Sequence, residues 1–174
     1  MALLHFSEDP AIEVFRPHVA PTSAETEPLV WAIDEERAPL YWFPRDCPRI
    51  AYWPSPTTSP GVLELFFAHT GARRVHAMES DWLERMRAVE LFVYSFDPEP
   101  FEVGGGFYVA RTDVRPLSVE PVGDLLALHA EAGIELRVTP SLRPLRDAIV
   151  ALHERDPKAL HFSMVRMRNA DLRA

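Results

Sequence analysis

Prolines interrupt this sequence along its whole length, and they limit how long any helix or strand can be. The chain has 17 prolines among 174 residues, about twice the usual share of this residue. Proline fixes φ and has no backbone N–H to donate, so it belongs at element ends and in turns. Because the prolines are dispersed, we interpret them as rigid turns and loop ends between short elements, not as a low-complexity tract.

The stretches between the prolines carry the patterns of both strands and helices. Strands are predicted at residues 2–6, 29–33, 50–53, 74–78, 89–96, 107–110, 134–138 and 161–167. Helices are predicted at residues 80–88, from Pro121 to Gly133, and after Ser141, while residues 62–68 are apolar but of uncertain type. The irregular order predicts the α+β class, as a single domain over residues 1–174 with a mixed or antiparallel sheet of about seven strands.

Two segments carry specific structural expectations. Residues 16–28 hold three prolines and are expected to form a loop long enough to act as a lid. Leu142, Leu145, Ile149 and Leu152 are spaced by three, four and three residues, which places them on one face of a helix.

Composition and charge narrow the class of protein. The net charge is −8, which argues against a generic binder of nucleic acids or anionic membranes. No apolar run approaches the ~20 residues of a membrane-spanning helix, and the acidic residues Glu8 and Asp9 near the start argue against a signal peptide. The single cysteine cannot form an internal disulfide, so we expect a cytoplasmic protein.

Several motifs of known chemistry are absent from the sequence. It has no G-x-x-x-x-G-K-[ST], no G-x-G-x-x-G after a strand, no H-E-x-x-H and no C-x-x-C. No metal site is therefore predicted, although His76, Glu79 and His69 remain as alternative ligands. The only lysine, Lys158, lies in a polar loop, where we do not expect a Schiff-base nucleophile.

The loop PRDCPR joins a cysteine to two arginines. Cys47 is either a small buried residue between two prolines or a thiol that the flanking arginines activate. Arg45 and Arg49 either pair with acids such as Asp46 or Glu35, or present two guanidinium forks to one anionic group.

His5 and Ser7 stand two residues apart on the first predicted strand. Side chains at that spacing lie on one face of a strand. His5 is either a satisfied core residue or a donor into a pocket, with the Ser7 hydroxyl beside it. Tyr41 and Trp42 belong to a cluster of aromatic residues in the same third of the chain, and one of them is expected to wall a pocket for a planar ligand.

The chain as a whole resembles a small bacterial family known only as a domain of unknown function. The segments that carry the resemblance are LLHFSEDPAIEVFRPH, LVWAIDEE, PRDCPR, VHAMESDWLERM, LFVYSFDPEPF, FYVA, DLLALHAEAGIELRV and FSMVRMRNA. The resemblance implies that nearly the whole chain belongs to this family, but the family brings no known activity.

The opening strands are also similar to those of ADP-ribosyltransferase-like proteins, in which a first-strand histidine holds the ribose of NAD. That resemblance implies NAD as a substrate, with His5 as this histidine and Ser7 as the hydroxyl two residues later. It implies Tyr41 or Trp42 as the aromatic that stacks on nicotinamide. Glu135 is the best match for the late acidic residue that stabilises positive charge on the ribose. Beyond residue 27, and so around Glu135, the sequence has no paired E-x-E motif.

Two functions follow from these observations. The first is an enzyme that uses NAD or another nucleotide, with His5 and Glu135 as catalytic residues. The second is a non-catalytic module on the same scaffold that binds a nucleotide, a phosphorylated ligand or a protein. In both, we expect the residues of one site to converge on a small anionic ligand: His5, Ser7, Tyr41 or Trp42, Arg45 and Arg49.

Overall fold

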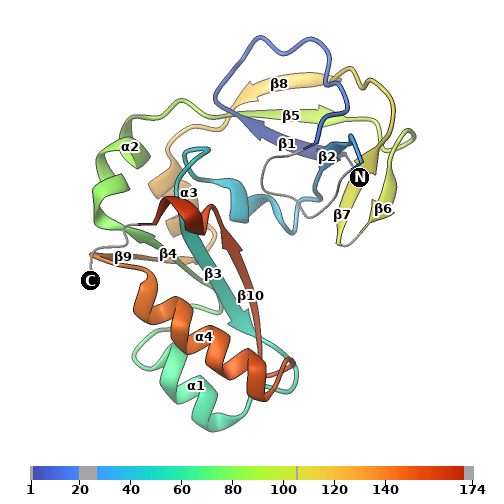
Figure 1. Cartoon of the computed structure of the whole chain (residues 1–174). Coiled ribbons are helices and arrows are strands. Elements are labelled where there is room, and N and C mark those ends of the chain that lie inside the picture. Colours follow the sequence, from blue (N-terminus) through green and yellow to red (C-terminus); the bar gives the residue numbers. More distant parts are fainter. Residues whose placement is uncertain (1, 20–26, 105, 171–174) are drawn as a thin grey trace. The chain divides into compact units, whose positions relative to one another are not determined.

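The computed structural model describes residues 2–19, 27–104 and 106–170, and it confirms the α+β class (Figure 1). Residues 20–26, most of the segment expected to form a lid-like loop, lie outside the described residues. The contacts of the chain divide it into two compact units. The first unit is Met1–Arg45 with Val89–Gly123, and the second is Asp46–Ala88 with Asp124–Ala174. Among the described helices, none has both the length and the apolar character needed to cross a bilayer.

The first unit is built from antiparallel strands. One sheet has the order β1-β5-β8 and the other β2-β7-β6. The backbones of Leu4 and Ile33 exchange two hydrogen bonds of 2.8 and 2.9 Å, which join β1 of the first sheet to the residue after β2 of the second. The strands are β1 (Leu3–Ser7), β2 (Val30–Ala32), β5 (Phe92–Phe96), β6 (Glu102–Gly104), β7 (Phe107–Ala110) and β8 (Ser118–Pro121).

Aromatic side chains fill the core of this first unit. The Phe15 ring lies edge-on to the rings of Tyr94 and Phe96, with both centroid distances 5.0 Å. Leu3 is fully buried beside them. Strand β1 therefore has backbone partners on both edges, β5 on one and Ile33 on the other, although residues 4–6 are only half-buried.

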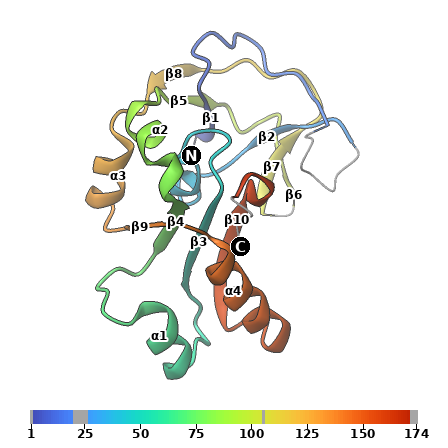
Figure 2. The same cartoon turned by 60° about the vertical axis from the view of Figure 1, so that its left-hand side comes forward.

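The second unit has one four-stranded sheet of order β10-β3-β4-β9, in which only the β4–β9 pair is parallel. Its strands are β3 (Arg49–Pro54), β4 (Val75–Glu79), β9 (Glu135–Thr139) and β10 (Leu160–Val165). Its helices are α1 (Pro60–Phe67), α2 (Leu83–Ala88), α3 (Leu125–Glu131) and α4 (Arg143–Arg155). Helices α1 and α4 lie close together in the view of Figure 1, and the turned view of Figure 2 shows them apart from each other.

The core of the second unit lies between the sheet and these two helices. Tyr52 of β3 and Ala77 of β4 pack with Phe66 of α1 and with Ile149 of α4. The stripe predicted for α4 is confirmed: Leu142, Ile149 and Leu152 are buried, and Leu145 is half-buried against the same core. The carboxylate of Glu79, itself buried, accepts a hydrogen bond of 3.0 Å from the Leu142 N–H at the start of α4.

The strands are divided among three sheets, rather than the single sheet of about seven strands that we expected. Two short edge strands, β6 and β8, also occur where no strand is predicted from the sequence. Pro121 ends β8 instead of starting a helix, and α3 begins after Asp124, whose side chain accepts hydrogen bonds from the N–H groups of Leu126 and Ala127. The uncertain segment 62–68 is mostly helix α1, which the Ser59 side chain caps.

Each unit has a core of its own, formed only by residues of that unit. A single domain over residues 1–174 stays a prediction, which the folding of an excised second unit would test.

Candidate functional site

His5 is the best candidate for a ligand-binding side chain in the first unit. Its Nδ1 lies 2.9 Å from the Trp31 carbonyl oxygen. A carbonyl oxygen only accepts hydrogen bonds, so Nδ1–H is the donor and the neutral ring carries its lone pair on Nε2. The ring packs edge-on against Phe15 at 4.9 Å, yet the residue is only half-buried. In the described part of the chain, Nε2 has no hydrogen-bond partner.

The surroundings keep His5 uncharged near neutral pH. Burial is the main cause that lowers the pKa of His5, and the positive charges of Arg45 and His18 lower this pKa further. The hydrogen bond to the Trp31 carbonyl acts in the opposite direction. The Nε2 of His5 is therefore a hydrogen-bond acceptor, whereas the sequence suggests a donor.

Ser7 has a structural role in the turn that follows β1. It is 2% exposed, and its Oγ accepts a hydrogen bond of 3.1 Å from the Asp9 N–H. The Tyr94 hydroxyl holds the same segment, since it donates to the Asp9 carbonyl at 2.6 Å and accepts from the Ile12 N–H at 3.1 Å. Both His5 and Ser7 belong to β1, so their spacing of two places them on one face of the strand, as predicted. The Ser7 hydroxyl, however, is hydrogen-bonded within the turn after β1.

Tyr41 and Trp42 come from a short 3-10 helix, Ala38–Tyr41, and the residue that ends it. The Tyr41 ring stacks on the Phe6 ring with a centroid distance of 6.3 Å and an interplanar angle of 10°. Phe6 points to the opposite side of β1 from His5, because successive side chains alternate. This contact places Tyr41 on the Phe6 face of the strand. The Trp42 N–H donates to the Pro39 carbonyl and closes the 3-10 turn.

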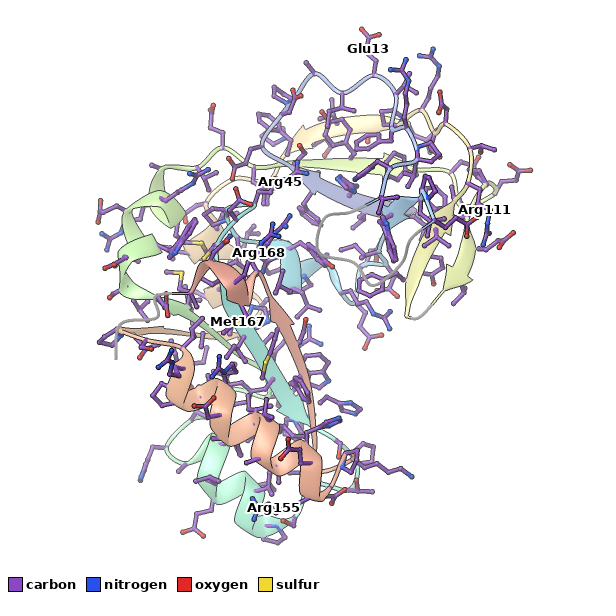
Figure 3. All side chains as sticks on the ribbon, in the orientation of Figure 1. Glu13, Arg45, Arg111, Arg155, Met167 and Arg168 are labelled. Carbon is purple, nitrogen blue, oxygen red and sulfur yellow. The ribbon has the colours of Figure 1, made fainter. Side chains whose placement is uncertain are left out.

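Arg45 is tied to the end of β1 by its backbone. Its N–H donates a hydrogen bond of 2.8 Å to the Glu8 carboxylate, and Figure 3 labels its side chain. Together with the effect of its charge on the pKa of His5, this bond places Arg45 in the neighbourhood of His5. The structure therefore brings together two of the predicted site residues within the first unit.

Arg49 belongs to the second unit, so its convergence with Arg45 on one anion stays a prediction. It is 5% exposed, and its Nη1 donates a hydrogen bond of 3.0 Å to the Cys47 carbonyl. Asp46, which we considered as a partner for these arginines, has its carboxylate 3.9 Å from Arg166 and its carbonyl bonded to Asn169.

Cys47 is a small buried residue, which is the first of the two interpretations of its sequence context; the second was an activated thiol. It is 0% exposed, and burial raises the pKa of its thiol to about 12. The thiolate that nucleophilic chemistry needs is therefore not populated near neutral pH.

Glu135, the predicted late acid, also lies in the second unit, on β9. Its carboxylate accepts a hydrogen bond from the Arg137 Nε. Hydrogen bonds from Thr70 and Arg137 lower the pKa of Glu135. This carboxylate is thus already neutralised by a neighbouring cation on its own strand.

A buried pair of histidines connects α3 to the sheet of the second unit, and no sequence motif predicts it. His76 Nδ1 lies 3.0 Å from His129 Nε2, and His129 Nδ1 lies 2.7 Å from the Leu125 carbonyl oxygen. Because the carbonyl accepts, His129 Nε2 is the acceptor for the Nδ1–H of His76. Burial lowers the pKa of His129 and lowers the pKa of His76 to about 2.

The predicted alternative ligands do not form a metal site. His76 and Glu79 stand three residues apart on β4 and therefore lie on opposite faces of the sheet. Within the described ranges, no three or more histidine, cysteine, aspartate or glutamate side chains are grouped so that they could hold a metal ion.

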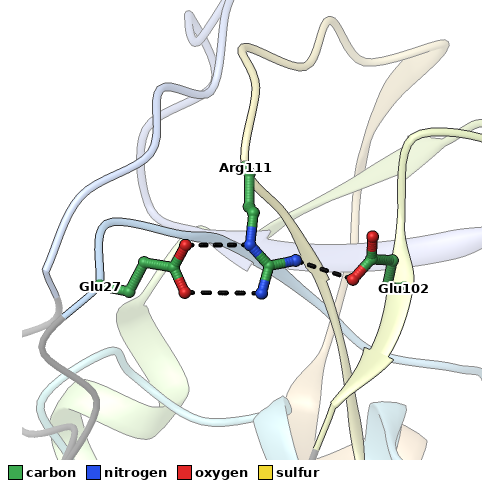
Figure 4. A network of polar contacts seen from close by, with 3 residues as sticks. All are labelled: Glu27, Glu102 and Arg111. Atoms are coloured by element: carbon green, nitrogen blue, oxygen red, sulfur yellow. Dashed lines mark hydrogen bonds and ion pairs between the residues drawn. The ribbon is translucent and has the colours of Figure 1, made fainter.

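An exposed ion-pair network lies at the edge of the first unit (Figure 4). Arg111, directly after β7, contacts Glu27 at 2.9 Å and Glu102 of β6 at 2.7 Å. All three side chains are at least half exposed. Exposed ion pairs of this kind contribute little to stability because solvent screens them, and the network is not a candidate site.

The comparisons with known proteins give a family but no activity. A family model described as a family of unknown function, DUF6886, matches residues 4–170. No curated protein matches the chain, and no solved structure does.

Proposed function

We propose a ligand-binding role for this chain, which belongs to DUF6886, a family of unknown function, and whose role therefore has to be inferred from its own residues. The ligand is a small phosphorylated molecule with hydroxyl groups, of the sugar-phosphate or nucleotide class. Its site is the part of the first unit around His5 and Arg45.

The state of the His5 ring carries this proposal. The Trp31 carbonyl fixes Nδ1–H, so Nε2 is an acceptor on a half-buried side chain. A ligand hydroxyl can donate to such a nitrogen. The Arg45 guanidinium, whose charge acts on His5, suits the phosphate of the same molecule. An acceptor beside a cation selects for a ligand that has both a donor and a negative charge.

Binding is favoured over turnover because the carboxylate expected to assist NAD cleavage is already engaged. Glu135 is ion-paired with Arg137, so it offers less charge to a developing cation on the ribose. The NAD-using enzyme of the ADP-ribosyltransferase type is the second candidate, and it rests on the first-strand position of His5.

Calorimetric titrations with NAD, ADP-ribose and ribose 5-phosphate test the proposal. The decisive variant is His5→Asn, since the asparagine amide can still donate to the Trp31 carbonyl but offers no nitrogen acceptor in the place of Nε2. We expect this variant to bind ribose 5-phosphate about fivefold more weakly, the effect of one lost hydrogen bond, with little change in Tm.

The control is His153→Asn, because His153 is an exposed histidine of α4 in the second unit. It should bind as the wild type does. Equal affinity of His5→Asn and wild type would remove His5 from the site, and no heat with any of the three probes would refute the binding role. Release of nicotinamide from NAD that disappears in His5→Asn would favour the enzyme instead.

A further inference from the structure

Three side chains from three neighbouring strand positions form a stack in the second unit. Trp53 of β3 lies directly opposite His161 of β10, and their rings are stacked with centroids 5.8 Å apart and an interplanar angle of 23°. The Arg74 guanidinium carbon lies 4.5 Å from the centre of the Trp53 ring. Arg74 directly precedes β4, which pairs with β3 on the side away from β10. The order across the sheet is therefore Arg74, Trp53, His161.

The polar edges of this stack are available to a ligand. In the part of the chain that the structure describes, neither the indole N–H of Trp53 nor either ring nitrogen of His161 has a hydrogen-bond partner. Trp53 is half-buried and His161 is exposed. A tryptophan that only fills a core usually has its N–H satisfied within the protein. An exposed imidazole stacked on one side leaves its other side open.

The loops beside the stack are held in place by hydroxyl groups. Ser55 Oγ donates to the Lys158 carbonyl at 2.5 Å, and Thr57 Oγ1 donates to the same oxygen at 3.0 Å. Thr58 Oγ1 donates to the Ala159 carbonyl at 2.7 Å. These bonds join the end of β3 to the start of β10, so the surface around Trp53 and His161 is ordered before any ligand binds.

Positive charge accompanies the stack in two residues, Lys158 and Arg74. Lys158 is exposed, stands three residues before His161, and has no ion-pair partner among the described residues. Arg74 supplies a second cation on the other side of Trp53. The Asp156 carboxylate, two residues before Lys158, accepts a hydrogen bond from the Lys158 N–H. The stack thus combines the open ring face of His161, polar ring edges of Trp53 and His161 that are available for hydrogen bonds, and the positive charges of Arg74 and Lys158.

We infer that the Arg74–Trp53–His161 stack is a binding platform for a planar heteroaromatic ring that carries a phosphate, namely a nucleoside phosphate. The base stacks on the open side of His161, and Lys158 attracts its phosphate. The edge nitrogens of His161 and the indole N–H of Trp53 lie in the planes of their rings, so they are placed to bond to the ribose and phosphate groups that extend past the edge of the stack. This platform is separate from the His5 site, and each can fail without the other.

The experiment is an NMR titration with adenosine 5′-monophosphate, adenosine and ribose 5-phosphate. The indole N–H resonance of Trp53 is identified by its loss in Trp53→Phe. We expect this resonance to move with both ligands that contain the base and to stay in place with ribose 5-phosphate. In His161→Ala, the affinity for the monophosphate should fall about tenfold, within the range measured for loss of one stacked base.

Two further variants separate stacking from other effects. His153→Ala is the matched control, because His153 lies edge-on to an aromatic residue of β10, Phe162, with ring centroids 5.2 Å apart; its affinity should equal that of the wild type. Lys158→Met should lower the affinity for the monophosphate and leave the affinity for adenosine unchanged. The platform is refuted if the Trp53 resonance does not respond to adenosine, or if His161→Ala binds the monophosphate like the wild type while His5→Asn does not.

Discussion

At the scale of single residues, the histidine pair of the second unit makes stability depend on pH. His76 has a folded-state pKa of about 2, far below its ordinary value of 6.5, so below pH 6.5 the unfolded chain binds a proton that the folded chain does not. The free energy of unfolding should therefore fall as pH decreases from 7 to 5, by up to about 1.4 kcal/mol per pH unit for each such histidine. Urea unfolding at pH 7, 6 and 5 measures this slope, above the pH range in which ordinary carboxylates titrate.

Leucine variants of the pair serve as its control. His129→Leu leaves the Nδ1–H of His76 without an acceptor in a buried place and should cost about 1–3 kcal/mol at pH 7. The double variant His76→Leu with His129→Leu removes both polar partners, so it should recover part of this loss and lose much of the pH dependence. A double variant with the slope of the wild type would assign the pH dependence to other groups.

At the scale of elements, the stripe on α4 gives a graded series of truncations. Ile149→Ala should lower the free energy of unfolding by about 2–5 kcal/mol, because Ile149 is buried in the core of the second unit. Leu145→Ala should cost less, since Leu145 is half-buried. Val150→Ala, on the exposed side of the same helix, is the control and should change little. Chemical unfolding of the three variants measures these losses in the free energy of unfolding. An equal loss in Ile149→Ala and Val150→Ala would contradict the packing.

The same elements show how far the sequence predicts the fold. The period of α4 and the apolar run of β1 predict those two elements because each has one clear environment. Helix α1 stayed uncertain because Leu63 and Leu65 are apolar yet exposed, although Ser59 and Pro60 are typical of a helix start. Strand β8 was not predicted because all four of its residues are exposed. A strand without a buried face does not need alternating apolar and polar residues, so its sequence has no strand pattern.

The candidate site was predictable only where residues are close in sequence. His5 and Ser7 share one strand, and Arg45 follows the aromatic segment that the sequence singled out. The tautomer of His5 depends on the carbonyl of Trp31, which is 26 residues away, and the His76–His129 bond joins positions 53 residues apart. Contacts between residues so far apart in the sequence depend on the topology of the sheets, and no local sequence pattern predicts them.

At the scale of the whole molecule, each unit is formed by two separate stretches of chain around its own core. We expect the second unit to fold alone as residues 46–174 in which a short Gly-Ser linker replaces 89–123, because α2 and α3 then remain joined and every member of its core is retained. Cooperative urea unfolding, followed by circular dichroism, is the expected result. Loss of a cooperative transition, while the full chain keeps one, would support a single domain over residues 1–174.

The burial of Cys47 has a practical consequence for all of these experiments. It is the only thiol in the chain, and its pKa of about 12 keeps it from reacting with maleimide dyes at neutral pH. A cysteine introduced at an exposed position, such as Val150→Cys, would then be the one site that takes a fluorophore or a spin label. With a second introduced cysteine, the distance between two chosen points of the chain can be measured in solution on a protein whose native cysteine is left in place.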